Sequence, residues 1–398
     1  MPGLRTTLAA LGTVLRHPRI LKAPPEVNAF LFRYIRKFRV RRVGRNIIIH
    51  SHLPPLQGKA YERFIDEHLL GSAAGPSHAQ VALTNACPQR CTYCYNRDRT
   101  GRPMDKADIV RVVRELKSLG VVWMGWTGGE PLLNPDIVEL TGLASPDCAV
   151  KLFTTGCTLT PALARDLRNA GLFSVSVSLD HWEEGRHDAH RGYPGAFQAA
   201  LRAIRIFLET GGVQVGVSAV LSRDLIVEQR VDEFLDFLQG LGAHEAWISE
   251  TKPSVQPFWN DGIIPSDADR RSLRDLQDRR NRRGPMTVNY LGHFECGDHF
   301  GCNAGTKMVY VDAFGGVSPC VFTPLEFGNV RDRPLPDIMR EMTGAFRSAK
   351  GCFINRNYAL FQKFAAAGET VIRGPRSAEL MSNVVFGPPP LFTEISRR

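Results

Sequence analysis

Long hydrophobic runs are missing from this sequence of 398 residues. No stretch approaches the roughly 18–20 uninterrupted apolar residues that a membrane-spanning helix needs. The apolar run at 8–15 is short, and basic residues follow it without a small-x-small cleavage site. We therefore expect neither a membrane span nor a secretory signal, and we expect a cytoplasmic protein.

The cysteine pattern also lacks the features of a disulfide framework. The nine cysteines are an odd number, and three of them, Cys87, Cys91 and Cys94, stand within eight residues. Reduced thiols that hold a metal in a cytoplasm fit this usage better than disulfides do.

Acidic residues are nearly absent from the first 50 residues. This segment holds eleven Lys or Arg and one acid, Glu26, so its net charge of +10 equals that of the whole chain. Residues 28–43 mix aromatic and basic side chains and predict an amphipathic helix, which can lie on an anionic membrane at its inner face. The alternative is a helix that packs on the main domain with solvated arginines. We expect no nucleic-acid partner, because the sequence contains no recognisable nucleic-acid-binding module.

The body of the chain alternates strand and helix. Apolar runs predict strands at 81–84, 121–126, 149–154, 174–179, 213–220 and 245–248, with helical patterns between them. Six β-α repeats with apolar strands indicate a parallel sheet covered by helices, which is a partial (β/α)6 TIM-like barrel. In such a sheet the chemistry lies at the carboxyl ends of the strands. The three-cysteine loop follows the first strand, so it lies where a site is expected.

The three cysteines have the spacing C-x3-C-x2-C. A loop of this spacing can wrap three soft thiolates around a single inorganic cluster. A tetranuclear iron–sulfur cluster held by three thiolates keeps one iron open for chemistry. A zinc knuckle is the alternative explanation of the spacing.

A second motif, Gly128-Gly129-Glu130-Pro131, follows the second predicted strand. Two glycines allow a close backbone approach, and a glutamate supplies an acceptor for a cationic group. The combination of this motif with the cysteine loop, including Tyr93 before the last cysteine, resembles the radical S-adenosylmethionine (SAM) superfamily. The resemblance covers roughly residues 80–250.

This resemblance implies a [4Fe-4S] cluster on the three cysteines, with SAM bound to the open iron. In that family, reductive cleavage of SAM gives a 5′-deoxyadenosyl radical that abstracts hydrogen from the substrate. The positions of this chain that would contact SAM by the same resemblance are Tyr93, Gly128, Gly129, Glu130, Pro131, Thr155, Ser178, Asp180, Arg191 and the backbone at Val220. The alternative for the strand-end positions is a capping role.

The region at 286–352 resembles the auxiliary-cluster domains of the SPASM/twitch subgroup. Its C-x12-G-x4-C run ends at Cys320, but the C-x2-C-x5-C-x3-C run of a full SPASM domain is absent. The resemblance therefore implies one auxiliary [4Fe-4S] cluster, with Cys302, Cys320 and Cys352 as ligands and Cys296 as the fourth. The alternatives are a three-cysteine cluster and a hairpin with buried thiols.

The expected architecture has four parts: a basic helical arm and linker at 1–79, the barrel at 80–285, a small α+β iron–sulfur domain at 286–352, and a C-terminal helix and tail at 353–398. The expected reaction is hydrogen abstraction followed by oxidation of the substrate radical, with the auxiliary cluster as electron acceptor. Redox-neutral epimerisation or C–C bond formation is the alternative, and a non-catalytic cluster scaffold is a distant one.

Peptide, sugar-like and lipid-linked substrates all fit this expectation, with flavodoxin or ferredoxin as the reductant. Two further residues are predicted to act on the substrate. Cys157 follows a strand end and could donate hydrogen to a substrate radical. Glu250 ends the sixth predicted strand and could contact the substrate.

Overall fold

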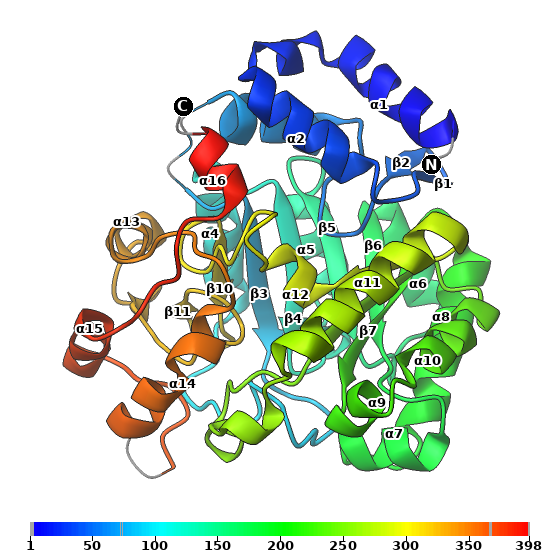
Figure 1. The fold of residues 1–398 in the computed structure, drawn as a ribbon. Helices are drawn as coiled ribbons and strands as arrows, with labels where there is room; N and C mark the ends of the chain where they lie inside the picture. Colours follow the sequence, from blue (N-terminus) through cyan, green and yellow to red (C-terminus); the bar gives the residue numbers. More distant parts are fainter. Residues whose placement is uncertain (1–3, 72, 74, 366–367, 397–398) are drawn as a thin grey trace.

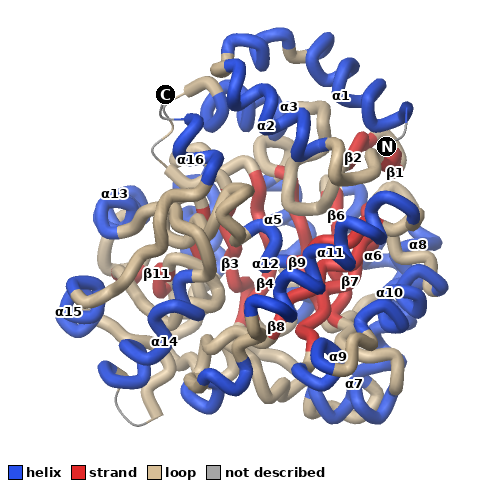
Figure 2. Tube along the Cα trace, in the orientation of Figure 1, coloured by secondary structure: helices blue, strands red, loops and turns tan. Residues whose placement is uncertain are grey.

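A ten-stranded sheet forms the centre of the molecule, with helices packed on its outer face (Figure 1, Figure 2). The computed structural model describes residues 4–71, 73, 75–365 and 368–396. The strand order is β12-β11-β10-β3-β4-β5-β6-β7-β8-β9, and all neighbours from β10 to β9 are parallel. The strands that follow the chain order are β3 His78–Thr84, β4 Trp123–Gly128, β5 Ala149–Thr154, β6 Leu172–Ser178, β7 Gln214–Leu221, β8 Glu245–Glu250 and β9 Thr287–Tyr290.

The first six of these strands are the six that the sequence predicts, so the partial barrel is confirmed. The seventh, β9, was not predicted, and it extends the sheet past residue 286. The division of the chain at 285/286 stays a prediction, although the sheet runs across it.

The helices between the strands follow from amphipathic periodicity and from capping side chains. In α4, Lys106–Ser118, the buried positions Ile109, Val112, Val113 and Leu116 recur at three- and four-residue spacing. The Asp105 carboxylate accepts from the Asp108 N–H at 2.9 Å and fixes the start of that helix. The other barrel helices are α5 Ile137–Ala144, α6 Pro161–Asn169, α7 Glu184–Arg191, α8 Ala196–Thr210, α9 Arg223–Val227, α10 Val231–Gly240 and α11 Asp267–Arg283.

The N-terminal arm packs on the rest of the chain instead of projecting from it. It contains helix α1, Leu4–Arg16, a short 3₁₀ turn η1, Pro18–Lys22, and helix α2, Pro25–Ile35. The single helix predicted over 28–43 is wrong in its second half, because the helix ends at Ile35 and Arg41–Val43 forms strand β1, which pairs with β2, Asn46–Ile48. The aromatic side chains of this stretch, Phe30, Tyr34 and Phe38, are buried in a cluster with C-terminal residues.

The predicted linker at 51–79 contains α3, Lys59–Arg63, and η2, Phe64–Leu69, and its first residues close the amino end of the barrel. Ser51 bonds there to three strands. Its carbonyl accepts from Trp123 Nε1 at 2.8 Å, its N–H donates to Glu245 Oε2 at 3.0 Å, and its hydroxyl accepts from Lys151 Nζ at 2.5 Å. The barrel interior is therefore closed at this end by the arm.

The C-terminal region continues the same sheet. Strands β10, Met308–Val311, and β11, Gly316–Ser318, form the antiparallel hairpin that the sequence predicts, and β12, Gly328–Asn329, pairs with β11. Because β10 lies beside β3, the hairpin joins the barrel directly. The remaining helices are α12 Leu291–Phe294, α13 Leu335–Ala345, α14 Phe353–Phe364, α15 Pro375–Ser382 and α16 Leu391–Ser396. None of the helices in the described part of the chain has both the length and the apolarity to cross a bilayer.

Candidate active site

One cavity of about 970 Å³ occupies the interior of the barrel. At the carboxyl ends of the strands it is lined by residues such as Thr154 and Ser178, and towards the amino ends by His78 and Trp247. Six of the seven cysteines predicted as metal ligands line it as well: Cys87, Cys91, Cys94, Cys302, Cys320 and Cys352. The fold thus brings both predicted thiol sets to a single space.

The pairing of β3 with β10 explains how the two thiol sets come to share this cavity. The first set follows the carboxyl end of β3. Cys302 precedes β10, and Cys320 comes just after β11, which runs back antiparallel to β10. Since β10 is parallel to β3, Cys302 and Cys320 of the second set lie towards the amino end of the same strands. The two thiol sets therefore lie towards opposite ends of the strand pair, with the cavity between them.

The glycine motif holds the cysteine loop in place by direct backbone contact. The Gly129 N–H donates to the Thr84 carbonyl at 2.7 Å, and the Glu130 N–H donates to the Ala86 carbonyl at 2.7 Å. A Cβ at Gly128 or Gly129 would overlap these carbonyl oxygens, and Gly128 has φ = +121°. The two glycines are needed because the backbone of one loop lies against the backbone of the other.

The Glu130 carboxylate lies behind the cavity wall and is fully buried. It accepts from the Thr155 N–H at 2.6 Å, from the Thr154 and Thr155 hydroxyls at 2.7 and 2.5 Å, and from the Leu132 N–H at 3.0 Å. Burial raises its pKa. In this arrangement Glu130 ties the ends of β4 and β5 together, while Gly128, Gly129 and Thr155 face the cavity. Its predicted contact with SAM stays a prediction.

Four other predicted SAM positions meet in one buried network. Asp180 accepts from Arg191 Nη2 at 2.8 Å, from the Val220 N–H at 2.9 Å, and from the Tyr93 hydroxyl. Burial alone would raise the pKa of Asp180, but the Arg191 guanidinium lowers it below its usual range. Arg191 Nη1 also lies 3.9 Å from Cys91 Sγ. The network therefore connects strands β6 and β7 to the cysteine loop.

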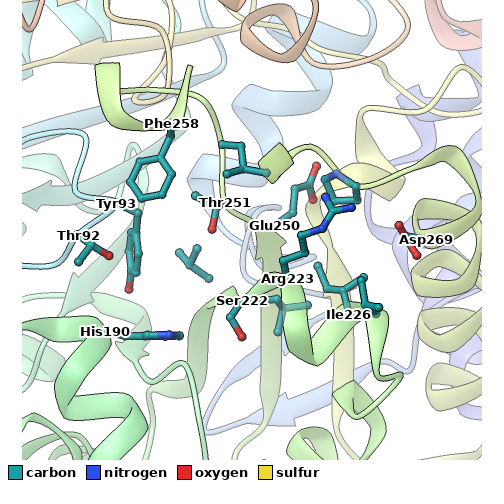
Figure 3. A pocket seen from close by; sticks show the side chains of 15 residues that line it. Thr92, Tyr93, His190, Ser222, Arg223, Ile226, Glu250, Thr251, Phe258 and Asp269 are labelled. Atoms are coloured by element: carbon teal, nitrogen blue, oxygen red, sulfur yellow. The ribbon is translucent and has the colours of Figure 1, made fainter. Parts of the chain in front are cut away.

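A smaller pocket of about 240 Å³ adjoins this network (Figure 3). Its walls include Tyr93, Val220 and Phe258, and Figure 3 shows the rings of Tyr93 and Phe258 near each other on one side. Glu250 lines both this pocket and the larger cavity. An aromatic pocket with backbone amides is a suitable environment for a flat heterocycle such as adenine.

Three buried charged groups, which we call the Lys252 triad, lie in the wall of the large cavity. Lys252 Nζ lies 3.0 Å from Glu250 Oε1 and 2.9 Å from Glu295 Oε2. Burial alone would lower the pKa of Lys252, but the Cys352 thiol and the two carboxylates raise it well above its usual value. The triad thus places a fixed cation near one of the predicted auxiliary ligands. The sequence indicated Glu250 because it ends a strand, but it gave no sign of Glu295.

Another pair that the sequence did not reveal is Arg99 with Asp312. Arg99 Nη1 donates to Asp312 Oδ2 at 3.0 Å, and both side chains are inaccessible to solvent. Asp312 also accepts from the N–H groups of Phe314 and Gly316, which fixes the turn of the β10–β11 hairpin. The pair therefore attaches the segment after the cysteine loop to the hairpin that precedes Cys320.

Five predicted site residues lie outside the cavity lining, namely Glu130, Pro131, Cys157, Asp180 and Cys296. Cys157 accepts from Gln89 Nε2 at 3.7 Å, and Gln89 stands between it and the cavity. Cys296 is absent from the lining that the other auxiliary cysteines share; burial raises the pKa of its thiol, and Asp298, Arg274 and Lys37 are the charged groups that act on it. The roles of Cys157 and Cys296 stay predictions.

All nine cysteines are free thiols, and burial raises the pKa of Cys87 to about 12. Across the described residues, no three His, Cys, Asp or Glu side chains converge at the spacing of a single metal ion. The basis for a cluster in this structure is the loop itself, which presents three thiols to one cavity with a guanidinium beside them. A cation next to a thiol favours the thiolate that binds metal.

Comparison with known proteins gives the same assignment as these motifs. The Radical SAM superfamily model matches residues 81–238, and a model described as an iron–sulfur cluster-binding domain, SPASM, matches residues 302–360. The chain is 30% identical to a PqqA peptide cyclase of Methylobacterium nodulans, over 68% of this chain and 74% of that protein. The chain belongs to the radical SAM superfamily. It is a SPASM-type radical SAM enzyme that uses SAM and a [4Fe-4S] cluster, and its SPASM domain implies auxiliary iron–sulfur chemistry.

Other relatives span several activities. The chain is 25% identical to an AdoMet-dependent heme synthase of Methanosarcina barkeri, over 64% of this chain and 80% of that protein. Among solved structures, Streptococcus suis SuiB bound to its precursor peptide SuiA superposes with a TM-score of 0.59 at 18% identity and covers 76% of each chain. That likeness supports the fold, which is the partial barrel with a C-terminal iron–sulfur region.

Proposed function

We propose that this radical SAM enzyme oxidises a substrate held in the 970 Å³ cavity and passes one electron to an auxiliary cluster on Cys302, Cys320 and Cys352. The observation that carries the proposal is the single cavity that both thiol sets line. When bound, the cluster and SAM supply a radical that removes a hydrogen atom from a substrate carbon. A substrate between the two thiol sets can lose its hydrogen on one side and its electron on the other.

The residues of this chain would contribute binding and orientation. Tyr93 and Val220 would hold the adenine in the side pocket, Arg191 the methionyl carboxylate, and Ser178 with Asp180 the ribose. Because Asp180 already accepts three hydrogen bonds, its role would include positioning Arg191 and Tyr93. Burial alone would raise the pKa of Glu250, but Lys252 keeps it below its usual range, so an ionised carboxylate faces the substrate space.

We further propose a peptide as the substrate. The PqqA peptide cyclase among the relatives supports this class, as does SuiB, whose structure contains a precursor peptide. Redox-neutral C–C bond formation is the second candidate reaction, because that relative is named a cyclase. A low-potential carrier such as flavodoxin or ferredoxin would supply the initiating electron.

The test is an auxiliary variant in which Cys302, Cys320 and Cys352 are all replaced by Ala. Anaerobically reconstituted, it should lose about four irons, one cluster's content, relative to the parent protein. It should still form 5′-deoxyadenosine from SAM with dithionite, since the Cys87–Cys94 loop is intact. An unchanged iron content would contradict the auxiliary assignment. Cys296→Ala tests the predicted fourth ligand: a loss of iron from this variant would support that role, and the parent iron content would contradict it.

A further inference from the structure

Exposed apolar side chains are concentrated at one end of this molecule. The described residues expose eight large hydrophobic side chains, and five of them lie within the first 32 residues. Single exposed leucines are ordinary on a protein surface, whereas such a grouping is typical of an interaction site. We call this region the arm surface; its members are Leu8, Leu11, Leu15, Leu21 and Phe32, with the exposed cations Arg16, Lys22, Arg33 and Arg36.

The apolar part of the arm surface has the geometry of an amphipathic helix. Leu8, Leu11 and Leu15 follow each other at three- and four-residue spacing, so they share one face of α1. They are 56%, 55% and 82% exposed, while Thr13 on the same helix is buried. The opposite side of α1 packs on α2, and the two helices form the outermost layer at that end of the molecule (Figure 1).

The charges of the arm are positive with one exception. Glu26 is the only acid among the first 50 residues. Within the described part of the chain, none of the four cations of the arm surface forms a salt bridge, whereas Arg19 is paired with Asp66. The Arg36 guanidinium lies 5.3 Å from the centre of the exposed Phe32 ring. A partner that covers this surface must therefore supply both an apolar layer and negative charge.

We propose that the arm surface binds an anionic lipid bilayer, with α1 lying in the plane of the interface. Leucines that enter the headgroup boundary and basic side chains that meet lipid phosphates are the two contributions to such binding. The contact differs in part from the one expected from residues 28–43. Phe30, Tyr34 and Phe38 are buried in a cluster with the C-terminal helix, and of that stretch only Phe32, Arg33 and Arg36 belong to the arm surface. The proposed membrane binding does not depend on the proposed reaction and remains valid if that reaction is wrong.

The arm surface and the large cavity lie on opposite sides of helix α2. On its other side, α2 contributes Val27 and Leu31 to the cavity lining, Pro24 precedes that helix, and α16 contributes Phe392. Helices α1 and α2 therefore lie between the bound bilayer and the substrate space. This arrangement places the enzyme on a membrane with its cavity next to the lipid surface.

The test is co-sedimentation of the full-length, cluster-loaded protein with vesicles of phosphatidylcholine alone or with about one third phosphatidylserine. Binding is expected only with the anionic vesicles, and it should weaken as salt rises. The variant Leu8→Ser/Leu11→Ser/Leu15→Ser should bind about tenfold or more weakly. The variant Arg33→Glu/Arg36→Glu should also bind more weakly, and the loss of each cation should reduce the affinity by about fivefold or more.

Val385→Ser is the matched control, because Val385 is 58% exposed and its backbone bonds to Asn357 of α14. It should bind as the parent does, and an unchanged melting temperature of the leucine variant would show that its fold is intact. Equal binding to neutral and anionic vesicles, or full binding by the leucine variant, would overturn the proposal. So would self-association in light scattering that the leucine variant abolishes, since a second copy would then be the partner.

Discussion

The Asp180–Arg191 ion pair offers a quantitative test of the proposed SAM site. The side chain of Asp180 is inaccessible to solvent and that of Arg191 is 8% exposed. Asp180→Asn removes the negative charge but keeps the shape, which leaves the Arg191 guanidinium buried without its counter-ion. Breaking a buried pair in this way costs about 3–5 kcal/mol.

The assay is urea unfolding of the cluster-free protein under reducing conditions, followed by tryptophan fluorescence. Asp180→Asn should lower the free energy of unfolding by about 3–5 kcal/mol with an unchanged m-value. The control is Glu341→Gln, which breaks the exposed Arg333–Glu341 pair of similar length, 2.9 Å, and should cost less than about 1 kcal/mol.

A double variant, Asp180→Asn/Arg191→Met, should recover part of the loss, because it removes the buried cation as well. If Asp180→Asn costs no more than the exposed control, Asp180 does not hold Arg191 as described. The role assigned to this network in positioning the SAM contacts would then be refuted.

Three further predictions concern the parts that support the site. Arg99→Met leaves Asp312 of the hairpin turn buried and unpaired, so the free energy of unfolding in urea should fall by about 3–5 kcal/mol. A fall of less than about 1 kcal/mol would contradict the attachment of the cysteine loop to the hairpin through this pair. Gly129→Ala forces a Cβ onto a carbonyl of the cysteine loop, so the purified protein should lose iron, whereas Gly142→Ala, which has free space, should not. Burial lowers the pKa of His50 to about 3 and that of His78 to about 4. The unfolded chain binds protons at these two histidines as the pH falls through 6.5, and the folded chain does not. These two groups alone should therefore lower the free energy of unfolding by about 2–3 kcal/mol from pH 7.5 to 5.5, and other buried histidines such as His244, whose pKa burial lowers to about 4, should add to the loss. A flat profile would refute this.

Local patterns predicted much of the fold. The six apolar runs and the glycines after the helices indicated strands β3 to β8, because a parallel sheet buried on both faces needs continuous apolar strands. The helix predicted over 28–43 was wrong, because its aromatic residues pack against distant chain segments and Arg41–Val43 pairs with β2. Periodicity in one segment cannot show which distant residues will cover it.

The same distinction between local patterns and distant contacts applies to the site. Spacing revealed Cys87, Cys91 and Cys94, since ligands on one loop are local in sequence. Glu295 could not be predicted, because its role depends on contact with Lys252, which lies 43 residues earlier in the chain. The shared cavity was also not predictable, since it depends on β10 lying beside β3.

The most direct test of the central claim is SAM cleavage by the anaerobically reconstituted enzyme. With dithionite and SAM, the account predicts that 5′-deoxyadenosine and methionine form together in equal amounts. The variant Cys87→Ala/Cys91→Ala/Cys94→Ala should form neither, although it should keep the iron of the auxiliary site. If the parent protein, with its iron loaded, forms no 5′-deoxyadenosine, or if the triple variant forms as much as the parent, the account of this active site is contradicted.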